Sequence, residues 1–166
     1  MPKKLLIVRH AKAEDADFQK ADFKRSLSTR GKNDIPKMAA RLVRKGIIPQ
    51  RFISSPALRA ISTARYFAIE MGLVPLEIIQ DPEIYDALTF NLLEMINKLD
   101  DDTDFVALFG HNPSITQLVN HLCDEHIDNI PTCGMALMDF PFDTWKMLSM
   151  GTGVLVYFDF PKNTEL

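Results

Sequence analysis

Leu5-Leu6-Ile7-Val8-Arg9-His10-Ala11 opens with four large apolar residues and then carries two basic side chains. Such an uninterrupted apolar run is typical of a parallel strand at the centre of a sheet, because both of its faces are buried. It is too short for the apolar core of a signal peptide or for a membrane span, which needs about 20 residues. We therefore predict a buried first strand with Arg9 and His10 at its carboxyl end.

Outward from this strand, the chain alternates strands with helices. The predicted strands that follow are residues 51–54, 76–79 and 105–109. Apolar residues at helical spacing predict helices over residues 28–46, 56–72, 92–99 and 115–122. Ser28 is the predicted N-cap of the first helix, and the apolar stripes of the first two helices include Val43 and Leu58. The polar segment 12–24 is predicted as a loop.

The last part of the chain has a different pattern, with short apolar stretches separated by short turns. Its predicted strands are residues 135–140, 144–149 and 154–160. Short connections require antiparallel pairing. The sequence therefore predicts one α/β domain over residues 1–166. Its expected form is a three-layer α/β/α sandwich, with a mainly parallel central sheet and antiparallel C-terminal edge strands.

The composition narrows the classes of partner. The chain has 166 residues and a net charge of -3, so it lacks the basic surface that nucleic-acid binding requires. Cys123 and Cys133 have no zinc-ligand spacing around them. The acidic run 100–102 has no other ligands to join it, so we expect no metal. Reduced cysteines and the absence of a membrane segment favour a cytoplasmic location.

Three polar segments are expected to meet at one edge of the sheet. Arg9-His10 follows the first strand, Ser54-Ser55-Pro56 follows the second, and Gly110-His111-Asn112-Pro113 follows the strand at 105–109. Ligands of such sheets bind beyond the carboxyl ends of the parallel strands. Each segment alone could be an ordinary turn or surface feature. Their convergence is what predicts a functional site.

The residue types in these segments suit phosphoryl chemistry. A neutral imidazole, such as that of His10, can attack phosphorus and form a covalent phosphohistidine that water later cleaves. The planar guanidinium groups of Arg9 and Arg59 can each hold two phosphate oxygens. The backbone N–H groups that start the helix after His111 also favour an anion. His111, if protonated, can donate a further hydrogen bond to the phosphoryl group.

Taken together, these motifs resemble the histidine phosphatase superfamily. The matching residues are Leu-Ile-Val-Arg-His-Ala at 6–11, Ser-Ser-Pro-Ala-Leu-Arg-Ala at 54–60 and Gly-His-Asn-Pro at 110–113. The opening Arg-His-Ala-Lys-Ala is most similar to the branch of SixA-type phosphohistidine phosphatases. The resemblance implies a phosphoglycerate mutase-like fold and a phosphatase without a cofactor. Its implied substrate is a phosphorylated group, with a phosphohistidine-bearing protein as partner.

The resemblance also implies a role for individual residues. His10 would be the nucleophile, while Arg9, Arg59 and His111 would hold the phosphate. Arg25 precedes a Leu-Ser-Thr-Arg-Gly segment as the phosphate-binding arginine does in SixA-type proteins. Ser55 would touch the phosphate or shape the turn, and Glu83 would be a general acid or a solvated loop residue.

Two other functions remain open at this point. One is a phosphatase or mutase for small phosphomonoesters. Many superfamily members have Arg-His-Gly-Glu followed by a phosphate-binding asparagine, and this chain has Ala11 and lacks that asparagine, which disfavours a mutase. The other is a non-enzymatic module that binds phosphate or a phosphoprotein. A module of that kind has no need of the nucleophile His10.

Overall fold

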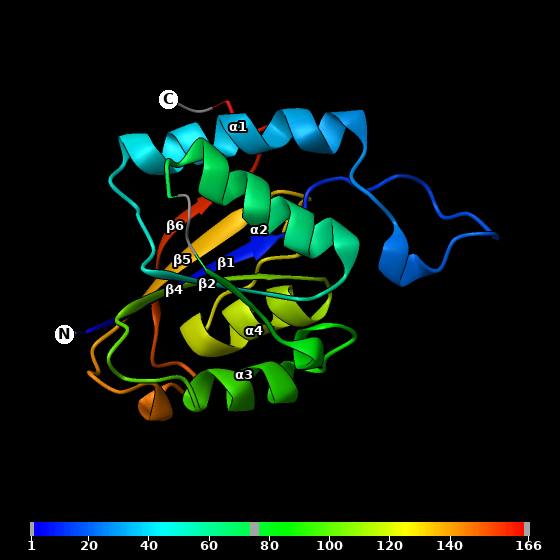
Figure 1. Cartoon of the computed structure of the whole chain (residues 1–166). Helices are drawn as coiled ribbons and strands as arrows, with labels where there is room; N and C mark the ends of the chain where they lie inside the picture. Colours follow the sequence, from blue (N-terminus) through cyan, green and yellow to red (C-terminus); the bar gives the residue numbers. More distant parts are fainter. Residues whose placement is uncertain (1, 74–76, 165–166) are drawn as a thin grey trace.

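The computed structural model describes residues 2–73 and 77–164, which form one sheet covered by helices on both faces (Figure 1). The sheet has the strand order β3-β2-β4-β1-β5-β6. The strands are β1 (Lys3–Arg9), β2 (Arg51–Ser54), β3 (Ile78–Gln80), β4 (Phe105–Gly110), β5 (Met135–Phe140) and β6 (Val154–Asp159). The first four strands are parallel, and β5 and β6 pair antiparallel at one side.

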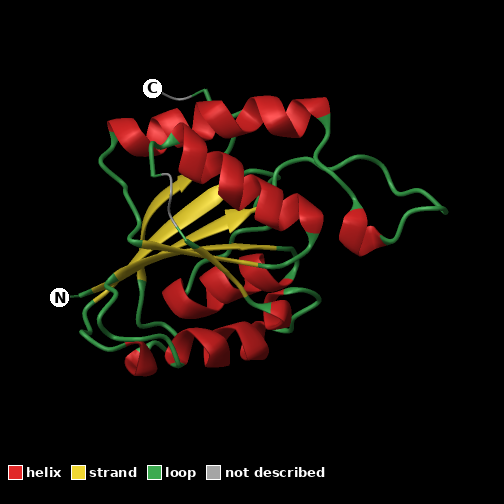
Figure 2. Cartoon of the chain, viewed as in Figure 1, coloured by secondary structure: helices red, strands yellow, loops and turns green. Residues whose placement is uncertain are grey.

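The helices lie in two layers, one on each face of the sheet (Figure 2). The first layer holds α1 (Thr29–Arg44) and α2 (Leu58–Glu70), and the second holds α3 (Thr89–Asn97) and α4 (Ser114–Cys123). Three short 3₁₀ turns complete the described elements: η1 (Asp22–Lys24), η2 (Pro82–Ile84) and η3 (Trp145–Met147). No helix in the described part of the chain is both long and apolar enough to cross a membrane.

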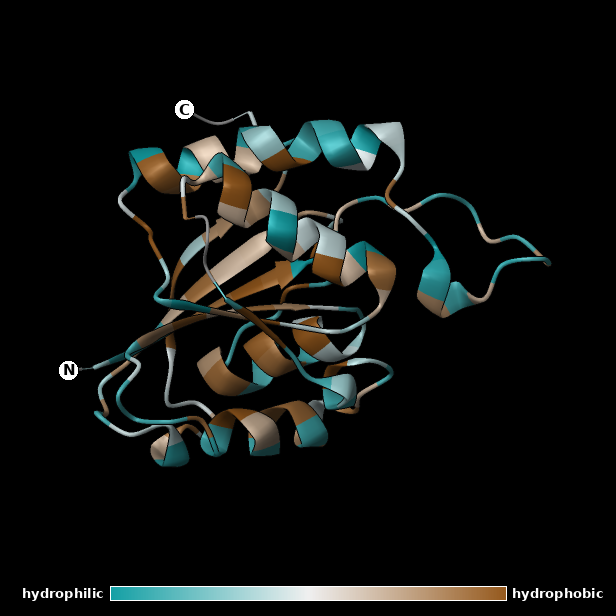
Figure 3. Ribbon diagram, in the orientation of Figure 1, coloured by the Kyte–Doolittle hydropathy of each residue, from teal (hydrophilic) through white to brown (hydrophobic). Residues whose placement is uncertain are grey.

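The opening strand separates two apolar cores. Leu5 and Ile7 pack in the core beneath α3 and α4, whereas Leu6 and Val8 pack in the core beneath α1 and α2. All four side chains are at most 1% exposed. Figure 3 shows the strands as mainly hydrophobic and the outer side of α1 as hydrophilic. The predicted three-layer α/β/α sandwich is therefore confirmed, as is a first strand buried on both faces.

One predicted strand is wrong. Residues 144–149 were expected to pair within the sheet, but they form η3, which lies beside α3. Trp145 and Leu148 are buried, while Met147 between them is half exposed, so the apolar spacing is three rather than two. Asp101 accepts the backbone N–H of Trp145, and the Asn97 side chain donates to the carbonyls of Trp145 and Leu148. These side chains replace the hydrogen bonds that a neighbouring strand would supply.

Smaller corrections concern the edges of the predicted elements. Val43 is 46% exposed and Leu58 is 37% exposed, so neither belongs to the buried stripe of its helix. The predicted strand 76–79 is observed at Ile78–Gln80, and Leu76 lies outside the described residues. The predicted N-cap Ser28 is confirmed, because its Oγ accepts the backbone N–H of Gly31 at 3.1 Å.

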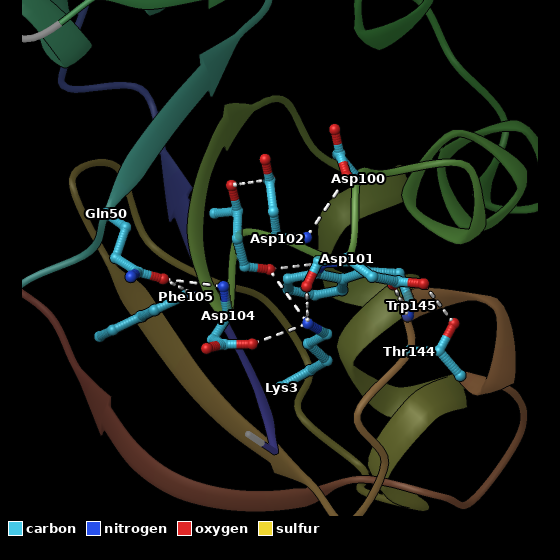
Figure 4. A network of polar contacts seen from close by, with 10 residues as sticks. Lys3, Gln50, Asp100, Asp101, Asp102, Asp104, Phe105, Thr144 and Trp145 are labelled. Carbon is cyan, nitrogen blue, oxygen red and sulfur yellow. Dashed lines mark hydrogen bonds and ion pairs between the residues drawn. The ribbon is translucent and has the colours of Figure 1, made fainter.

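A buried lysine anchors the amino end of β1 (Figure 4). Lys3 is fully buried, and its Nζ donates to Asp104 Oδ1 at 2.8 Å and to the carbonyl oxygens of Asp101 and Thr103. The same Nζ lies 5.7 Å from the centre of the Trp145 ring. This network ties β1 to the loop before β4 and to η3, at the end of the strand opposite Arg9.

Candidate active site

Three neighbouring strands deliver the predicted segments to one edge of the sheet. In the register of the sheet, Arg9 of β1 is level with Gly110 of β4, and Phe109 of β4 is level with Ser54 of β2. The side chains beyond these positions surround a hollow of about 250 Å³. It is lined by Arg9, His10, Lys12, Ala13, Arg25, Arg59, His111, Asn112 and Thr132. The predicted convergence at this edge is therefore observed.

The imidazole of His10 is fixed in position and orientation. Its backbone N–H donates to the carbonyl of Gly110, and its own carbonyl accepts the N–H of Cys133. The ring Nδ1 lies 2.8 Å from the carbonyl oxygen of Ala11. A carbonyl can only accept, so Nδ1 carries the proton and Nε2 keeps its lone pair. Burial lowers the pKa of His10 to about 3, so the ring is neutral at physiological pH.

Two arginines are each held by one end of the guanidinium group. Arg9 donates from Nη1 to the carbonyl of Ile130 at 3.0 Å. Arg59 donates from Nη1 to the carbonyl of Asp22 at 2.9 Å and from Nη2 to Asp22 Oδ2 at 3.0 Å. The Nε atoms of Arg9 and Arg59 are buried and have no hydrogen-bond partner among the described residues.

His111 lies beside His10, with 5.2 Å between the ring centres. Its Nε2 is 2.8 Å from Ser55 Oγ, and that Oγ already accepts the backbone N–H of Ala57. Burial, followed by Arg59, lowers the pKa of His111 to about 4, so the ring is neutral at physiological pH rather than protonated as expected from the sequence. The Ser55 hydroxyl can then donate to Nε2, which leaves the ring proton on Nδ1. That Nδ1 is buried without a partner in the described part of the chain.

The four side chains share one arrangement. Each is held by hydrogen bonds at one end of the side chain. Among the described residues, Nε of Arg9, Nε of Arg59 and Nδ1 of His111 are buried without a partner, while Nε2 of His10 keeps its lone pair. Buried donors are nearly always paired in folded proteins. Unpaired N–H groups around a bare imidazole nitrogen therefore fit a ligand that has several acceptor oxygens, as a phosphoryl group has.

Arg25 reaches the hollow, as predicted, but it is also committed to other partners. It donates from Nε to Asp22 Oδ1 at 3.0 Å and from Nη1 to the carbonyl of Glu14 at 3.0 Å. The Asp22 carboxylate also accepts the hydroxyl of Tyr85 at 2.8 Å. The Tyr85 ring lies edge-on to His111, with 5.6 Å between ring centres. Sequence reasoning missed Asp22 and Tyr85, although Asp22 is three residues before Arg25.

The remaining two predicted residues lie outside the hollow. Ser55 is fully buried behind His111 and orients it, so it does not line the hollow. Glu83 is exposed in η2 and borders a separate hollow with Arg51 and Lys98. The structure does not bring Glu83 together with His10, and its role as a general acid stays a prediction. In the described residues, no group of three or more His, Cys, Asp or Glu side chains is placed to hold a metal ion.

A comparison with known protein families gives a match that is consistent with the observed fold and with the residues at this edge of the sheet. The sequence model of the histidine phosphatase superfamily (branch 1) matches residues 5–87, which is half of the chain. The chain therefore belongs to this superfamily, and it is a histidine phosphatase. The matched residues include His10, Arg25 and Arg59, and they end before β4 and His111.

Particular proteins are similar to the whole chain. An uncharacterized chloroplastic protein of Arabidopsis thaliana is 26% identical over 152 residues, which are 87% of this chain and 69% of that protein. A protein of Agrobacterium tumefaciens assigned as the phosphohistidine phosphatase SixA is 24% identical with a TM-score of 0.83, and the match covers 97% of this chain and 99% of that one. The protein histidine phosphatase SixA complexed with tungstate is 22% identical with a TM-score of 0.77, over 98% and 99% of the two chains. The two solved structures establish the shared fold.

Proposed function

We propose that this phosphatase removes the phosphoryl group from phosphohistidine on a protein, through a covalent intermediate on His10. The observation that carries the proposal is that Arg9, Arg59 and His111, which all line the hollow, each keep a buried nitrogen with no partner among the described residues. His10 lines the same hollow, and with its proton on Nδ1 its Nε2 keeps a lone pair for attack. Arg25 supplies a further positive charge at the rim.

In the first step, Nε2 of His10 attacks phosphorus in line with the bond that breaks. A new N–P bond forms on His10 while the P–N bond to the substrate imidazole breaks, and the departing nitrogen takes up a proton from solvent water. The phosphoryl oxygens accept hydrogen bonds from Arg9, Arg59 and His111, and these bonds stabilise the charge that spreads over the oxygens. The lowered pKa of His10 ensures that its lone pair is available.

In the second step, water attacks the phosphorus of the phosphorylated His10. The N–P bond breaks, inorganic phosphate leaves, and the imidazole returns to its neutral form. The hydrogen bond from Nδ1 to the Ala11 carbonyl stabilises any positive charge that the ring carries while it is phosphorylated. No cofactor enters either step.

The size of the hollow and the groups that line it favour phosphohistidine over an alkyl phosphate as substrate. The hollow of about 250 Å³ is below the range of about 300–1,000 Å³ that is usual for small-molecule sites, which favours a substrate of which only the phosphorylated end enters. None of the described residues that line it is a carboxylic acid that could protonate an alkoxide. Asp22 is close by, but hydrogen bonding from Tyr85 first, together with its arginine contacts, lowers its pKa to about 2. An imidazole leaving group is itself readily protonated and needs no strong acid.

Trapping the intermediate tests the role of His10. The enzyme is mixed with a histidine-phosphorylated peptide, quenched in alkali, and searched for acid-labile phosphate by mass spectrometry. We expect the phosphate on His10, and neither phosphate nor turnover in His10→Ala. The matched control is His121→Ala, a substitution at an exposed position of α4. Full turnover in His10→Ala would refute the mechanism.

A substrate panel tests the class of substrate. The kcat/KM for the histidine-phosphorylated peptide is compared with values for sugar phosphates, phosphoglycerates and nucleotides. We expect the peptide to be hydrolysed most efficiently. Strong turnover of one small metabolite with none of the peptide would instead favour the small-molecule phosphatase.

The expected partner is thus a protein that carries phosphohistidine. A cytoplasmic location also belongs to the proposal. It is supported by the two free cysteines, Cys123 and Cys133, which suit a reducing compartment.

A further inference from the structure

Asp22 connects three side chains that come from different parts of the fold. Its Oδ1 accepts Nε and Nη2 of Arg25, both at 3.0 Å. Its Oδ2 accepts Nη2 of Arg59 at 3.0 Å and the Tyr85 hydroxyl at 2.8 Å. Its backbone carbonyl accepts Nη1 of Arg59 at 2.9 Å. A half-exposed aspartate on the segment between β1 and α1 is therefore bound to α2 and to the turn that follows η2.

The contact with Arg59 leaves one edge of the guanidinium group free. Arg59 uses Nη1 and Nη2 to bind Asp22, and its buried Nε keeps a proton without a partner in the described residues. A guanidinium group is planar and rigid, so holding the Nη end also fixes the direction of the Nε–H bond. Arg59 is only 6% exposed, and it lines the hollow beside His10.

We infer that Asp22 is a positioning residue that aims the Nε edge of Arg59 at the transferring phosphoryl group. This inference rests on the proposed function, because it requires Arg59 to bind the phosphoryl group. Asp22 does not touch the substrate itself. It acts through Arg59 first and through Arg25 second, and Tyr85 holds the carboxylate in place from the opposite side.

The charge of Asp22 gives the inference a distinctive signature. An asparagine at this position can direct its carbonyl oxygen to only one arginine, and it then places its NH2 group against the other. Arg59 keeps its bond from Nη1 to the backbone carbonyl but loses the charged contact at Nη2, so its orientation is less firmly fixed and kcat falls. Removing a negative charge beside the hollow does not weaken the attraction for a phosphate dianion. We therefore expect KM to stay level or to fall while kcat falls.

The experiment is a double-mutant cycle in the full-length enzyme with para-nitrophenyl phosphate as the probe. The variants are Asp22→Asn, Arg59→Ala and the two combined. We expect Asp22→Asn to lower kcat by about ten- to a hundredfold, as small misplacements of a reacting group do. In the Arg59→Ala enzyme, Asp22→Asn should add about twofold or less, because residues that act as one unit are not additive. The matched control is Asp17→Asn, which removes the same charge from an exposed position in the same loop.

The outcomes separate this inference from the proposed function. If Arg59→Ala keeps the wild-type kcat, then the assignment of Arg59 to the phosphate fails, and the inference fails with it. If Arg59→Ala is impaired but Asp22→Asn is not, or if the two effects multiply in full, only the role of Asp22 is refuted. A raised kcat with a lower inhibition constant for vanadate would show that Asp22 is a competitor of phosphate instead. Tyr85→Phe keeps both arginine contacts, and its decrease in kcat should be smaller than that of Asp22→Asn.

Discussion

The rings of His10 and His111 are both buried, and this environment sets how each ring responds to pH. Each ring is bonded through one nitrogen, to the Ala11 carbonyl or to Ser55 Oγ. Burial is the largest cause of both lowered pKa values, which are about 3 for His10 and about 4 for His111. In the folded protein both rings are therefore neutral at a pH where an unfolded histidine, with a pKa near 6.5, is charged.

Because the pKa values of these histidines are lower in the folded than in the unfolded protein, we predict that the protein becomes less stable in acid. Between about pH 6 and pH 5, the unfolded chain binds a proton on most of these rings and the folded chain does not, so the free energy of unfolding falls as the pH falls. The loss is about 1.4 kcal/mol per pH unit for each histidine. Urea unfolding at pH 7, 6 and 5 measures it, and His10→Gln should reduce the slope by about that amount. An equal slope in both proteins would contradict the lowered pKa of His10.

The free Nε edge of Arg59 predicts a loss of rate when the side chain is removed. Arg59→Ala should lower kcat by about 10²–10³, as loss of a single charge-stabilising donor does. Initial rates with para-nitrophenyl phosphate measure the change. Arg65→Ala in the same helix is the control, because Arg65 is exposed on α2 and does not line the hollow. An unchanged kcat in Arg59→Ala would remove Arg59 from the phosphate site.

Single residues of the site differ in how far sequence can predict them. His10 and His111 follow buried apolar strands, so the position of each at the sheet edge follows from the strand pattern. Asp22 has no such marker, because oppositely charged residues three apart, such as Asp22 and Arg25, are common on protein surfaces. Only the fold brings Arg59 and Tyr85 to the same carboxylate.

Among the elements, α1 supports the site through its first turn. The Lys12 carbonyl accepts both the backbone N–H and the hydroxyl of Ser28, each at 2.9 Å. Gly31, one turn into α1, lies against the same carbonyl, and a Cβ at position 31 would clash with its oxygen. Lys12 and Ala13 line the hollow, so the start of α1 sets the position of one of its walls.

We predict that Gly31→Ala moves this wall. The clash is with backbone, which cannot rotate away, so the variant should lose about 1–3 kcal/mol of stability. It should also lower kcat, because the segment that follows His10 shifts. Urea unfolding and initial rates measure the two effects. Lys32→Ala, at the next and exposed position of α1, should change neither. Wild-type stability and rate in Gly31→Ala would show that the backbone at Lys12 can move aside without affecting the site.

The elements show where sequence patterns are sufficient and where they fail. The strand-helix alternation up to residue 123 follows from apolar periodicity, because each strand and helix buries one continuous surface. The predicted strand at 144–149 is wrong because the backbone of this segment forms hydrogen bonds with the side chains of Asn97 and Asp101, which are far away in sequence. The spacing of Trp145 and Leu148, three residues apart, was the available signal for a 3₁₀ turn.

At the scale of the whole molecule, the proposed active site and the buried Lys3 network lie at opposite ends of β1. His10 follows its carboxyl end, and the buried Lys3 network lies at its amino end (Figure 4). Lys3→Met should cost about 2–4 kcal/mol, because Nζ makes three hydrogen bonds and pairs with Asp104. The folded variant should keep the wild-type kcat.

Thermal unfolding and initial rates below the transition test this separation. Lys4→Met is the matched control, because Lys4 is half exposed and its ammonium group pairs with Asp139 at the surface. Its effect on stability should be within about 1 kcal/mol. A parallel loss of kcat and stability in Lys3→Met would show that the two ends of β1 are coupled.

Burial disfavours the reactive thiolate form of both cysteines. Cys133 is completely buried, and burial raises the pKa of both thiols, to about 12 for Cys123. Peroxide and alkylating agents attack thiolates, so such reagents should leave the activity intact, whereas diethyl pyrocarbonate, which acylates imidazole, should abolish it. Phosphatases that rely on a cysteine thiolate are silenced under oxidative stress. We expect this enzyme to keep its activity under the same oxidative conditions.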